Sequence, residues 1–582
     1  MWTKGIAAFL LLCMHLQVSA QSMSDLDRIL AFTGNADPEE LDEYEVERLA
    51  QYIVNPLKLN VASVSGLRSS GLLSPYQLAS LMDYRARHGD VLSYRELASV
   101  DGFNEAFVRL LAPFISLDGG SIRDVDPSYG RVRNDLTLKG GMKVANGAQS
   151  ESYGIKYRCR IGDEFSVAIS DMFSGHLEWN PSRGRFRIIA GDFNARFGQG
   201  LAMWNGMSMT GFSKPSAFYR SASGLSSSWS FTGSSAHTGI AGECSFPRMR
   251  LSSFVAFPGI KSRGADDGCS VLPALNIGWY GRNMCVSMSN YMELQPAVAT
   301  TPAYVPDMKT SADVAMCVNG IDVFSEVAYD WVNGTAAALA GTIFPFTENL
   351  RMAAHLRYYP SDYSSARSAA PRSVSKCSNE YGGAVCLDYS PRSGKLTGSV
   401  SVDAAYLPVG KEDGIESVQL KMIADGALKM SDAFMLKLRI SERIRTWGER
   451  FKTDVRSDLI WSSGGLSATC RLNVLKYVDY AFLSFLEGGY KGEKASLYLR
   501  QQFFLVDNWD DRIYSYERDA PGNFSVPAYY GRGLSTSMMA SWRFARWGRA
   551  YLKAGLTAYP FMPEEKKKPG KAELKLQLVF SL

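Results

Sequence analysis

The chain has 582 residues, of which 46% are apolar and 12% are aromatic, and its formal net charge is +5. This composition excludes an intrinsically disordered chain, and the small net charge excludes binding of nucleic acid through a general positive field. No run of about 20 consecutive apolar residues follows the N-terminal segment, so a transmembrane helix is not predicted.

Residues 1–20 are predicted to be a secretory signal peptide. Lys4 supplies a positive charge, an apolar run covers Ile6–Met14, and Val18-Ser19-Ala20 forms a small-residue cleavage site. The apolar run is too short to cross a membrane, although an uncleaved anchor is the alternative. The mature protein is therefore expected to be exported.

Residues 25–117 are predicted to form a small all-α domain. The runs 41–53 and 75–89 carry apolar residues at helical spacing, with Pro75 at a helix start and Gly89 at its end. Residues 94–115 predict two further helices that are separated at Asp101-Gly102.

The same segment carries a gapless pattern of single residues: Asn60, Ala62 and Ser63, then Tyr84-Arg85 and Gly89, then Gly102. In this pattern it resembles the helix-hairpin-helix repeat of exported competence-type (ComEA-type) DNA receptors. The resemblance implies a helix-hairpin-helix domain in the periplasm. It also implies a polyanion site at the hairpins, where glycine amides approach a phosphate.

The second hairpin is the better candidate for that site, because Leu72 and Ser74 occupy the glycine positions of the first. The candidate polyanion-binding or partner-binding residues are Gly102, Phe103, Asn104, Arg85, Arg87 and Arg109. A solvated helix face is the alternative interpretation of Arg85 and Arg87.

The charge of the helical segment weakens the DNA hypothesis. Residues 41–117 contain seven Lys or Arg against nine Asp or Glu, so few counterions would be released from a polyanion. We therefore expect the domain to dock a periplasmic or membrane partner. Weak binding or uptake of DNA, or of another polyanion, is the alternative.

From about residue 131 to residue 582, apolar residues recur at every second position. In 572–582 they are Leu574, Leu576, Leu578, Phe580 and Leu582. Similar runs occur at 153–162, 183–193, 434–444, 496–506 and 537–547, each about ten residues long, which is the length that a tilted membrane strand needs. Turns are predicted between runs at Asn319-Gly320, Asn333-Gly334 and Gly488-Gly489.

These runs predict a large antiparallel transmembrane β-barrel of about 20–24 strands over residues 131–582. Paired aromatics at Tyr358-Tyr359, Trp279-Tyr280 and Tyr529-Tyr530 are expected to form an interfacial girdle. The sequence ends on a strand pattern, which is typical of outer-membrane barrels. The protein is thus expected in the outer membrane, in contact with its lipid, and a soluble all-β fold is the alternative.

The layout of signal, helical domain and barrel is similar to that of a group of exported Gram-negative proteins. Their barrels carry stretches like GDFNARFGQGLAMW at 191–204 and DDRIYSYERDAPGNFSVPAYYGRGL at 510–534 of this chain. Glycines in the first stretch permit tight bends, and the charges of 510–532 suit a polar loop or lumen.

No catalytic residue, metal site or cofactor is predicted. The cysteines are scattered, and Cys377 and Cys386 are expected to be free thiols, with a loop disulfide as the alternative. His176 and His237 lie near carboxylates or serines in sequence, but the chain contains neither G-x-S-x-G nor H-E-x-x-H. A barrel hydrolase is therefore the least favoured function.

Overall fold

The structure is a computed structural model of the chain. It describes residues 25–33, 49, 52–53, 56–60, 62, 67, 70–73, 75–117, 132–145, 147–162, 164–171, 174–181, 186–205, 212–220, 222–229, 236–246, 248–260, 270–281, 284–295, 304–318, 321–347, 349–364, 366–391, 395–412, 415–492, 494–523, 525–566 and 568–582. The predicted signal peptide lies outside these residues. None of the helices in these ranges has both the length and the hydropathy needed to span a membrane.

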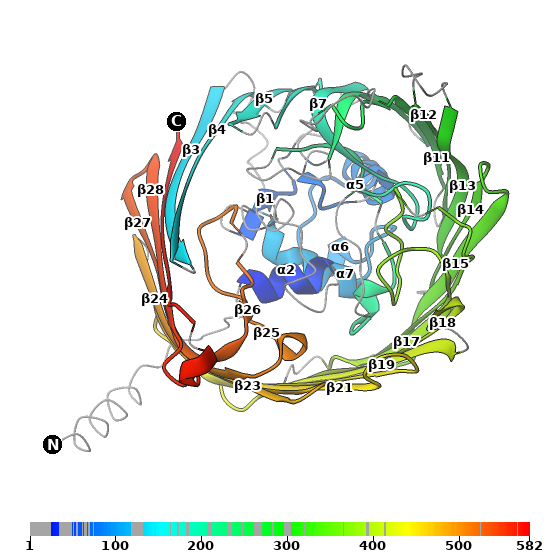
Figure 1. Ribbon diagram of the computed structural model, residues 1–582. Helices are drawn as coiled ribbons and strands as arrows, with labels where there is room; N and C mark the ends of the chain where they lie inside the picture. The colour runs from blue at the N-terminus through cyan, green and yellow to red at the C-terminus, as the bar shows by residue number, and fades with distance from the viewer. Residues whose placement is uncertain are drawn as a thin grey trace.

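Twenty-four antiparallel strands of the described chain form one closed ring (Figure 1). The first twelve are β3 (Val132–Ala145), β4 (Ala148–Ile161), β5 (Phe165–Ser170), β6 (Gly175–Trp179), β7 (Phe186–Arg196), β9 (His237–Ser245), β10 (Met249–Ala256), β11 (Leu272–Tyr280), β12 (Met284–Gln295), β13 (Tyr304–Val318), β14 (Ile321–Asp330) and β15 (Thr335–Pro345). The others are β16 (Leu350–Tyr359), β17 (Glu380–Tyr389), β18 (Leu396–Glu412), β19 (Ile415–Lys429), β20 (Phe434–Arg445), β21 (Phe451–Ser463), β22 (Leu466–Lys476), β23 (Tyr480–Lys491), β24 (Ala495–Val506), β27 (Gly531–Ala545), β28 (Gly548–Ala558) and β29 (Lys571–Ser581). The short β8 (Gly224–Ser227) pairs with the end of β7, beside the ring.

Closure occurs between the last strand and the first, since β29 pairs with β3 from Ala572 to Ser581. A closed ring leaves no sheet edge whose amides and carbonyls lack partners, which is what a membrane requires. The predicted barrel of 20–24 strands is confirmed, and the five predicted strand runs all fall on ring strands.

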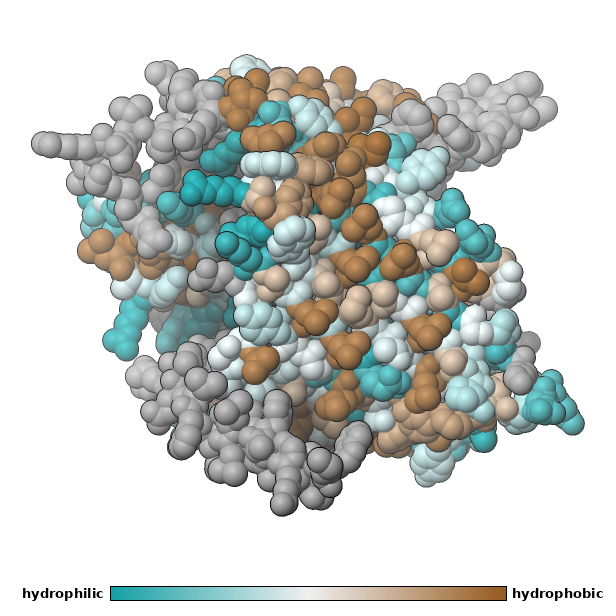
Figure 2. Space-filling model, turned by 90° about the vertical axis from the view of Figure 1, so that its left-hand side faces the viewer, coloured by the Kyte–Doolittle hydropathy of each residue, from teal (hydrophilic) through white to brown (hydrophobic). Residues whose placement is uncertain are grey.

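Apolar and polar side chains alternate along the strands as expected. On β29, Leu574 and Leu576 are exposed on the outer face, whereas Gln577 is buried on the inner face. Figure 2 shows rows of apolar side chains running across the outer face of the barrel. This surface is the apolar wall that lipid contact demands.

Two details of the predicted barrel are wrong. Gly488-Gly489 is not a turn but lies inside β23, where the bare Gly489 leaves room for the Tyr498 ring of β24. Tyr529 belongs to a buried cluster inside the barrel and not to an outer girdle. Turn Asn333-Gly334 is confirmed, and Asn319-Gly320 lies outside the described residues.

In the other two aromatic pairs, one ring points outward and the other inward. Tyr358 and Trp279 are exposed on the outer face, and Tyr359 is buried inside. Successive side chains of a strand point to opposite faces, so a pair of neighbours can place only one ring in the girdle.

Connections at the two ends of the ring differ in length. Strands β7, β16 and β24 run in the same direction, so the long connections that follow them leave the same end. We call the described parts of 197–236, 360–379 and 507–530 the inward loops, because Figure 1 shows them inside the ring. They include η3 (Pro215–Ala217), β25 (Ile513–Tyr514) and β26 (Ala528–Tyr529).

The N-terminal segment contains α2 (Asp25–Thr33), α5 (Pro75–His88), α6 (Tyr94–Leu97) and α7 (Glu105–Leu111). Helices are thus found where 75–89 and 94–115 predicted them. The segment also contains a short parallel sheet of β1 (Leu57–Lys58) and β2 (Ile115–Ser116), which was not predicted. Its helices are short, so a distinct all-α domain is not shown.

This helical module has a hydrophobic core of its own, separate from the clusters of the barrel. It lies within the outline of the ring in Figure 1 and contacts both an inward loop and the barrel wall. The helix α2 lies against η3 of the first inward loop, and Asn104 reaches Asp322 at the start of β14.

Candidate functional site in the barrel lumen

Arg85, one of the six predicted binding residues, is engaged inside the module. Its guanidinium donates to the carbonyl oxygens of Leu59 at 3.3 Å, Asn60 at 2.5 Å and Ala62 at 3.2 Å. Partial burial lowers the pKa of this arginine below its ordinary value. Arg85 therefore joins α5 to the segment before it and does not project toward a ligand.

Arg87 and Arg109 each form an exposed ion pair with a carboxylate that lies one helical turn earlier in the chain. Arg87 Nη2 lies 2.9 Å from Asp83, and Arg109 Nη2 lies 2.8 Å from Glu105. Exposed pairs of this kind are weak, so both arginines can exchange partners.

Residues 102–104, which were predicted as the second hairpin, form a tight turn that contacts the barrel. Gly102 has φ +83, and a Cβ there would lie 2.6 Å from the Tyr76 ring. Phe103 is buried in the module core. Asn104 caps α7 through Phe107 N and donates to Asp322 Oδ2 at 3.3 Å. The structure thus brings these three predicted residues together, opposite a barrel carboxylate.

The first inward loop is fastened to the wall by Glu326 of β14. One carboxylate oxygen accepts from Gln199 N at 2.6 Å and from Leu201 N at 3.0 Å, and the other from Ala202 N at 3.4 Å. The turn requires glycine, because a Cβ on Gly198 (φ +57) would lie 2.8 Å from the Glu326 carboxylate. The fastened turn, residues 198–202, belongs to the stretch 191–204 that the sequence analysis singled out.

The second inward loop is fastened by Arg357 of β16 and Glu380 of β17. Arg357 lies 2.8 Å from Glu380 and 2.6 Å from Asp403, and all three are buried. Glu380 also accepts from the loop amides of Ser373 at 3.1 Å and Val374 at 3.2 Å. A buried carboxylate shared between an arginine and backbone amides makes strong, directed contacts.

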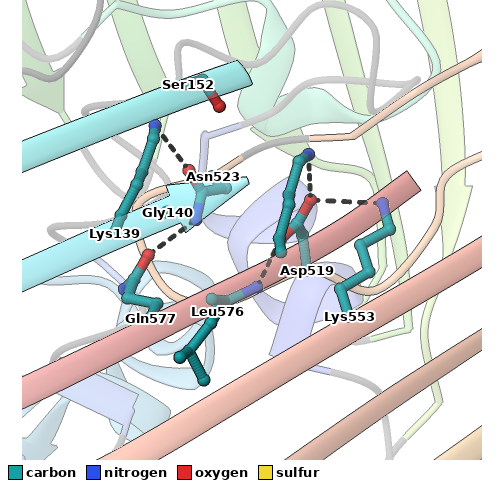
Figure 3. A pocket seen from close by; sticks show the side chains of 10 residues that line it. Lys139, Gly140, Ser152, Asp519, Asn523, Lys553, Leu576 and Gln577 are labelled. Carbon is teal, nitrogen blue, oxygen red and sulfur yellow. Dashed lines mark hydrogen bonds and ion pairs between the residues drawn. The ribbon is translucent and has the colours of Figure 1, made fainter. Parts of the chain in front are cut away.

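The third inward loop is fastened at the seam where the ring closes. Its Asp519 lies 3.2 Å from Lys553 of β28 and 3.0 Å from Lys575 of β29. Asn523 accepts from Lys139 of β3 at 3.0 Å and donates to Gln577 at 2.7 Å. Figure 3 shows these residues around a small pocket between loop and wall.

Sequence reasoning placed 510–532 in a polar loop or lumen, and these contacts confirm it. It did not find Glu326 or Glu380, since a lone acidic residue in a strand pattern carries no signal of its own. Their role depends on loops distant in sequence.

His176, the histidine that the sequence analysis considered first, has its Nε2 3.4 Å from Ser166 Oγ. His176 Nδ1 lies 3.0 Å from the Ser228 carbonyl oxygen, and its nearby Glu178 is bound by Arg187 at 2.8 Å. Cys377 and Cys386 are free thiols, as expected. In the described part of the chain, no group of three or more His, Cys, Asp or Glu is arranged to hold a metal ion.

No protein-family model and no curated protein matches the sequence. Among solved structures, the siderophore receptor PirA from Pseudomonas aeruginosa is similar with a TM-score of 0.39 and 8% identity, over 78% of this chain and 80% of the receptor. The P pilus usher PapC translocation pore gives 0.36 and 10%, over 77% and 99%. The copper transporter OprC gives 0.39 and 10%, over 78% and 81%. Similarity at this level identifies neither a family nor a substrate.

Proposed function

We propose that the protein is an outer-membrane barrel whose lumen is a passage that its own inward loops hold closed. The observation that carries this proposal is the way the loops are fastened. Each is tied to the inner wall by a few buried charged groups: Glu326, Arg357 with Glu380, and Asp519.

Barrel size supports a passage over a purely structural role. In barrels of about eight strands the inner side chains fill the lumen, whereas barrels above about twenty strands enclose a space that only additional chain can fill. A protein that needed only an anchor would not need that width. Closure by specific polar contacts is also reversible, because water can replace them when the loops leave.

The module and the connections support one orientation of the barrel in the membrane. Outer-membrane barrels have short turns on the periplasmic side and long loops outside. The inward loops would then enter from the cell exterior, and the module would close the periplasmic end through Asn104 and Asp322. On this reading the module keeps a helix-hairpin-helix fold and belongs to the gate.

A second role of the module is to dock a periplasmic partner, and its exposed apolar surface favours this. Leu92, just before α6, is 82% exposed, and Tyr94, the first residue of α6, is 41% exposed. Together with Arg87 and Arg109 they give the partner apolar and charged contacts. DNA is a weaker candidate, since Arg85 is engaged inside the module and the second hairpin faces Asp322.

The gate is tested by conductance of the purified protein in planar lipid bilayers. The wild type is expected to stay closed for most of the recording. The double variant Glu326→Ala, Asp519→Ala removes fastenings of two loops and is expected to open frequently. A matched control removes two exposed carboxylates at the same end of the barrel, Glu416→Ala and Glu449→Ala, and should remain closed.

Correct folding of each variant is checked by heat-modifiable gel migration. If the double variant folds and conducts no better than the wild type, the lumen is not a gated passage.

A further inference from the structure

The inner wall of β19–β22 carries a concentration of positive charge. Its lumen-facing positions hold nine basic side chains against three acidic ones, an excess of six, which is larger than the net charge of the whole protein. The basic residues are Lys421, Lys429, Lys437, Arg439, Arg443, Arg445, Lys452, Arg456 and Arg471. The acidic residues are Asp425, Asp454 and Asp458. We call this surface the basic arc.

Strand register places several of these like charges directly opposite one another. Lys421 pairs with Arg443 and Arg443 pairs with Lys452, so three positive side chains form a row across three strands. A second such contact joins Arg439 and Arg456. Like charges at directly opposite positions destabilise a sheet. Carboxylates lie opposite two other arc cations, since Asp425 pairs with Arg439 and Asp458 with Lys437, but the row of three contains none, and an anion over it would offset the repulsion.

The contrast with the rest of the wall strengthens this interpretation. Beneath the inward loops, arginines are matched by carboxylates at short range, as in Arg187 with Glu178 at 2.8 Å and Arg357 with Asp403 at 2.6 Å. In the basic arc Asp458 pairs with Arg471 at 2.6 Å and Asp425 with Arg439 at 3.5 Å, but three acidic side chains offset only part of the charge of nine basic ones.

Aromatic rings border the arc at the end where the inward loops enter. The Tyr477 ring lies 5.2 Å from the Arg443 guanidinium and 5.6 Å from Lys452 Nζ, and Trp447 lies 5.1 Å from Arg445. Rings in these positions hold the cations in place through their faces. Arg443 Nε is buried and donates no hydrogen bond within the described residues.

We propose that the basic arc binds anionic solutes with several phosphate or carboxylate groups and selects them for passage. This proposal rests on the proposed function, because it names the class of solute that the gated lumen would carry. Three cationic side chains whose Cβ atoms are about 5 Å apart match an anion that bears more than one charge, and a low-dielectric wall raises its local concentration.

Ion selectivity tests the arc in a channel that has been opened. In the Glu326→Ala, Asp519→Ala background, the reversal potential in a potassium chloride gradient should show preference for chloride. Adding Lys421→Gln, Arg443→Gln and Lys452→Gln should reduce that preference and abolish block by tripolyphosphate. The matched control neutralises three exposed cations instead, Lys411→Gln, Arg450→Gln and Lys494→Gln, and should change neither.

Binding tests the arc without requiring conduction. Isothermal titration of tripolyphosphate into the detergent-solubilised full-length protein should show binding. The affinity of the triple arc variant for tripolyphosphate should be lower by up to about tenfold, as expected for the loss of three partly exposed charge contacts. If the opened channel fails to conduct but this difference is found, the gate is wrong and the arc stands. If the opened channel conducts without anion preference, or the triple variant binds as the wild type does, the arc is wrong.

Discussion

Two arginines of the helical module act differently, although they are two residues apart on α5. Arg85 donates to three backbone carbonyls of the segment 59–62 and joins that segment to the helix. Arg87 makes one exposed pair with Asp83. Their spacing turns one side chain toward the module and the other toward solvent.

The substitution Arg85→Ala is expected to destabilise the module by about 2 kcal/mol, because the carbonyls would lose a charged donor while partly buried. The control Arg87→Ala should change stability by at most about 0.5 kcal/mol. Urea unfolding of a fragment of residues 22–118, followed by circular dichroism, measures both. Equal effects of the two substitutions would show that Arg85 is not a structural residue.

Among the helices, strands and turns, both the correct and the incorrect predictions have identifiable physical reasons. Strands such as β24 and β29 were predicted because the alternation of apolar and polar residues is visible in the sequence. The helices within 75–89 and 94–115 were predicted because their apolar residues recur at helical spacing. Gly488-Gly489 was assigned to a turn because two adjacent glycines usually indicate one. Here a glycine is needed inside a strand, because an aromatic ring of the neighbouring strand occupies the space that a side chain would fill. That neighbour, Tyr498, is visible only in the register of β23 with β24.

These two glycines provide a matched pair of substitutions. A Cβ on Gly489 would lie 2.3 Å from the Tyr498 ring, whereas one on Gly488 meets nothing within 4 Å. Gly489→Val is expected to cost about 1–3 kcal/mol through overpacking, and Gly488→Val should be close to neutral. The urea midpoint of the folded barrel in detergent, read by heat-modifiable gel migration, distinguishes them. Similar midpoints for both variants would contradict the pairing of β23 with β24.

At the scale of the whole molecule, the candidate site is the part that sequence could not predict. The barrel and its closing strand follow from the alternation of single strands. The basic arc and the loop fastenings depend on which strands are neighbours and in what register. Lys421, Arg443 and Lys452 are up to 31 positions apart in the chain, and nothing in their local sequence marks them as one row.

The closed barrel itself makes a prediction at Leu576, in the middle of β29 and 48% exposed on the outer face. If this face lies in lipid, Leu576→Arg places a charge near the centre of the bilayer and should destabilise the folded barrel by about 2–4 kcal/mol. The conservative Leu576→Met keeps an apolar side chain and should have little effect. Refolding into lipid vesicles over a range of urea concentrations measures the difference. Lys575 and Gln577, on either side of Leu576, point inward and hold the third inward loop. Leu576 points outward, so the arginine variant tests the wall without changing a side chain of the fastening. A soluble protein would tolerate the arginine at this exposed position, so an unchanged midpoint would contradict insertion of the barrel in a membrane.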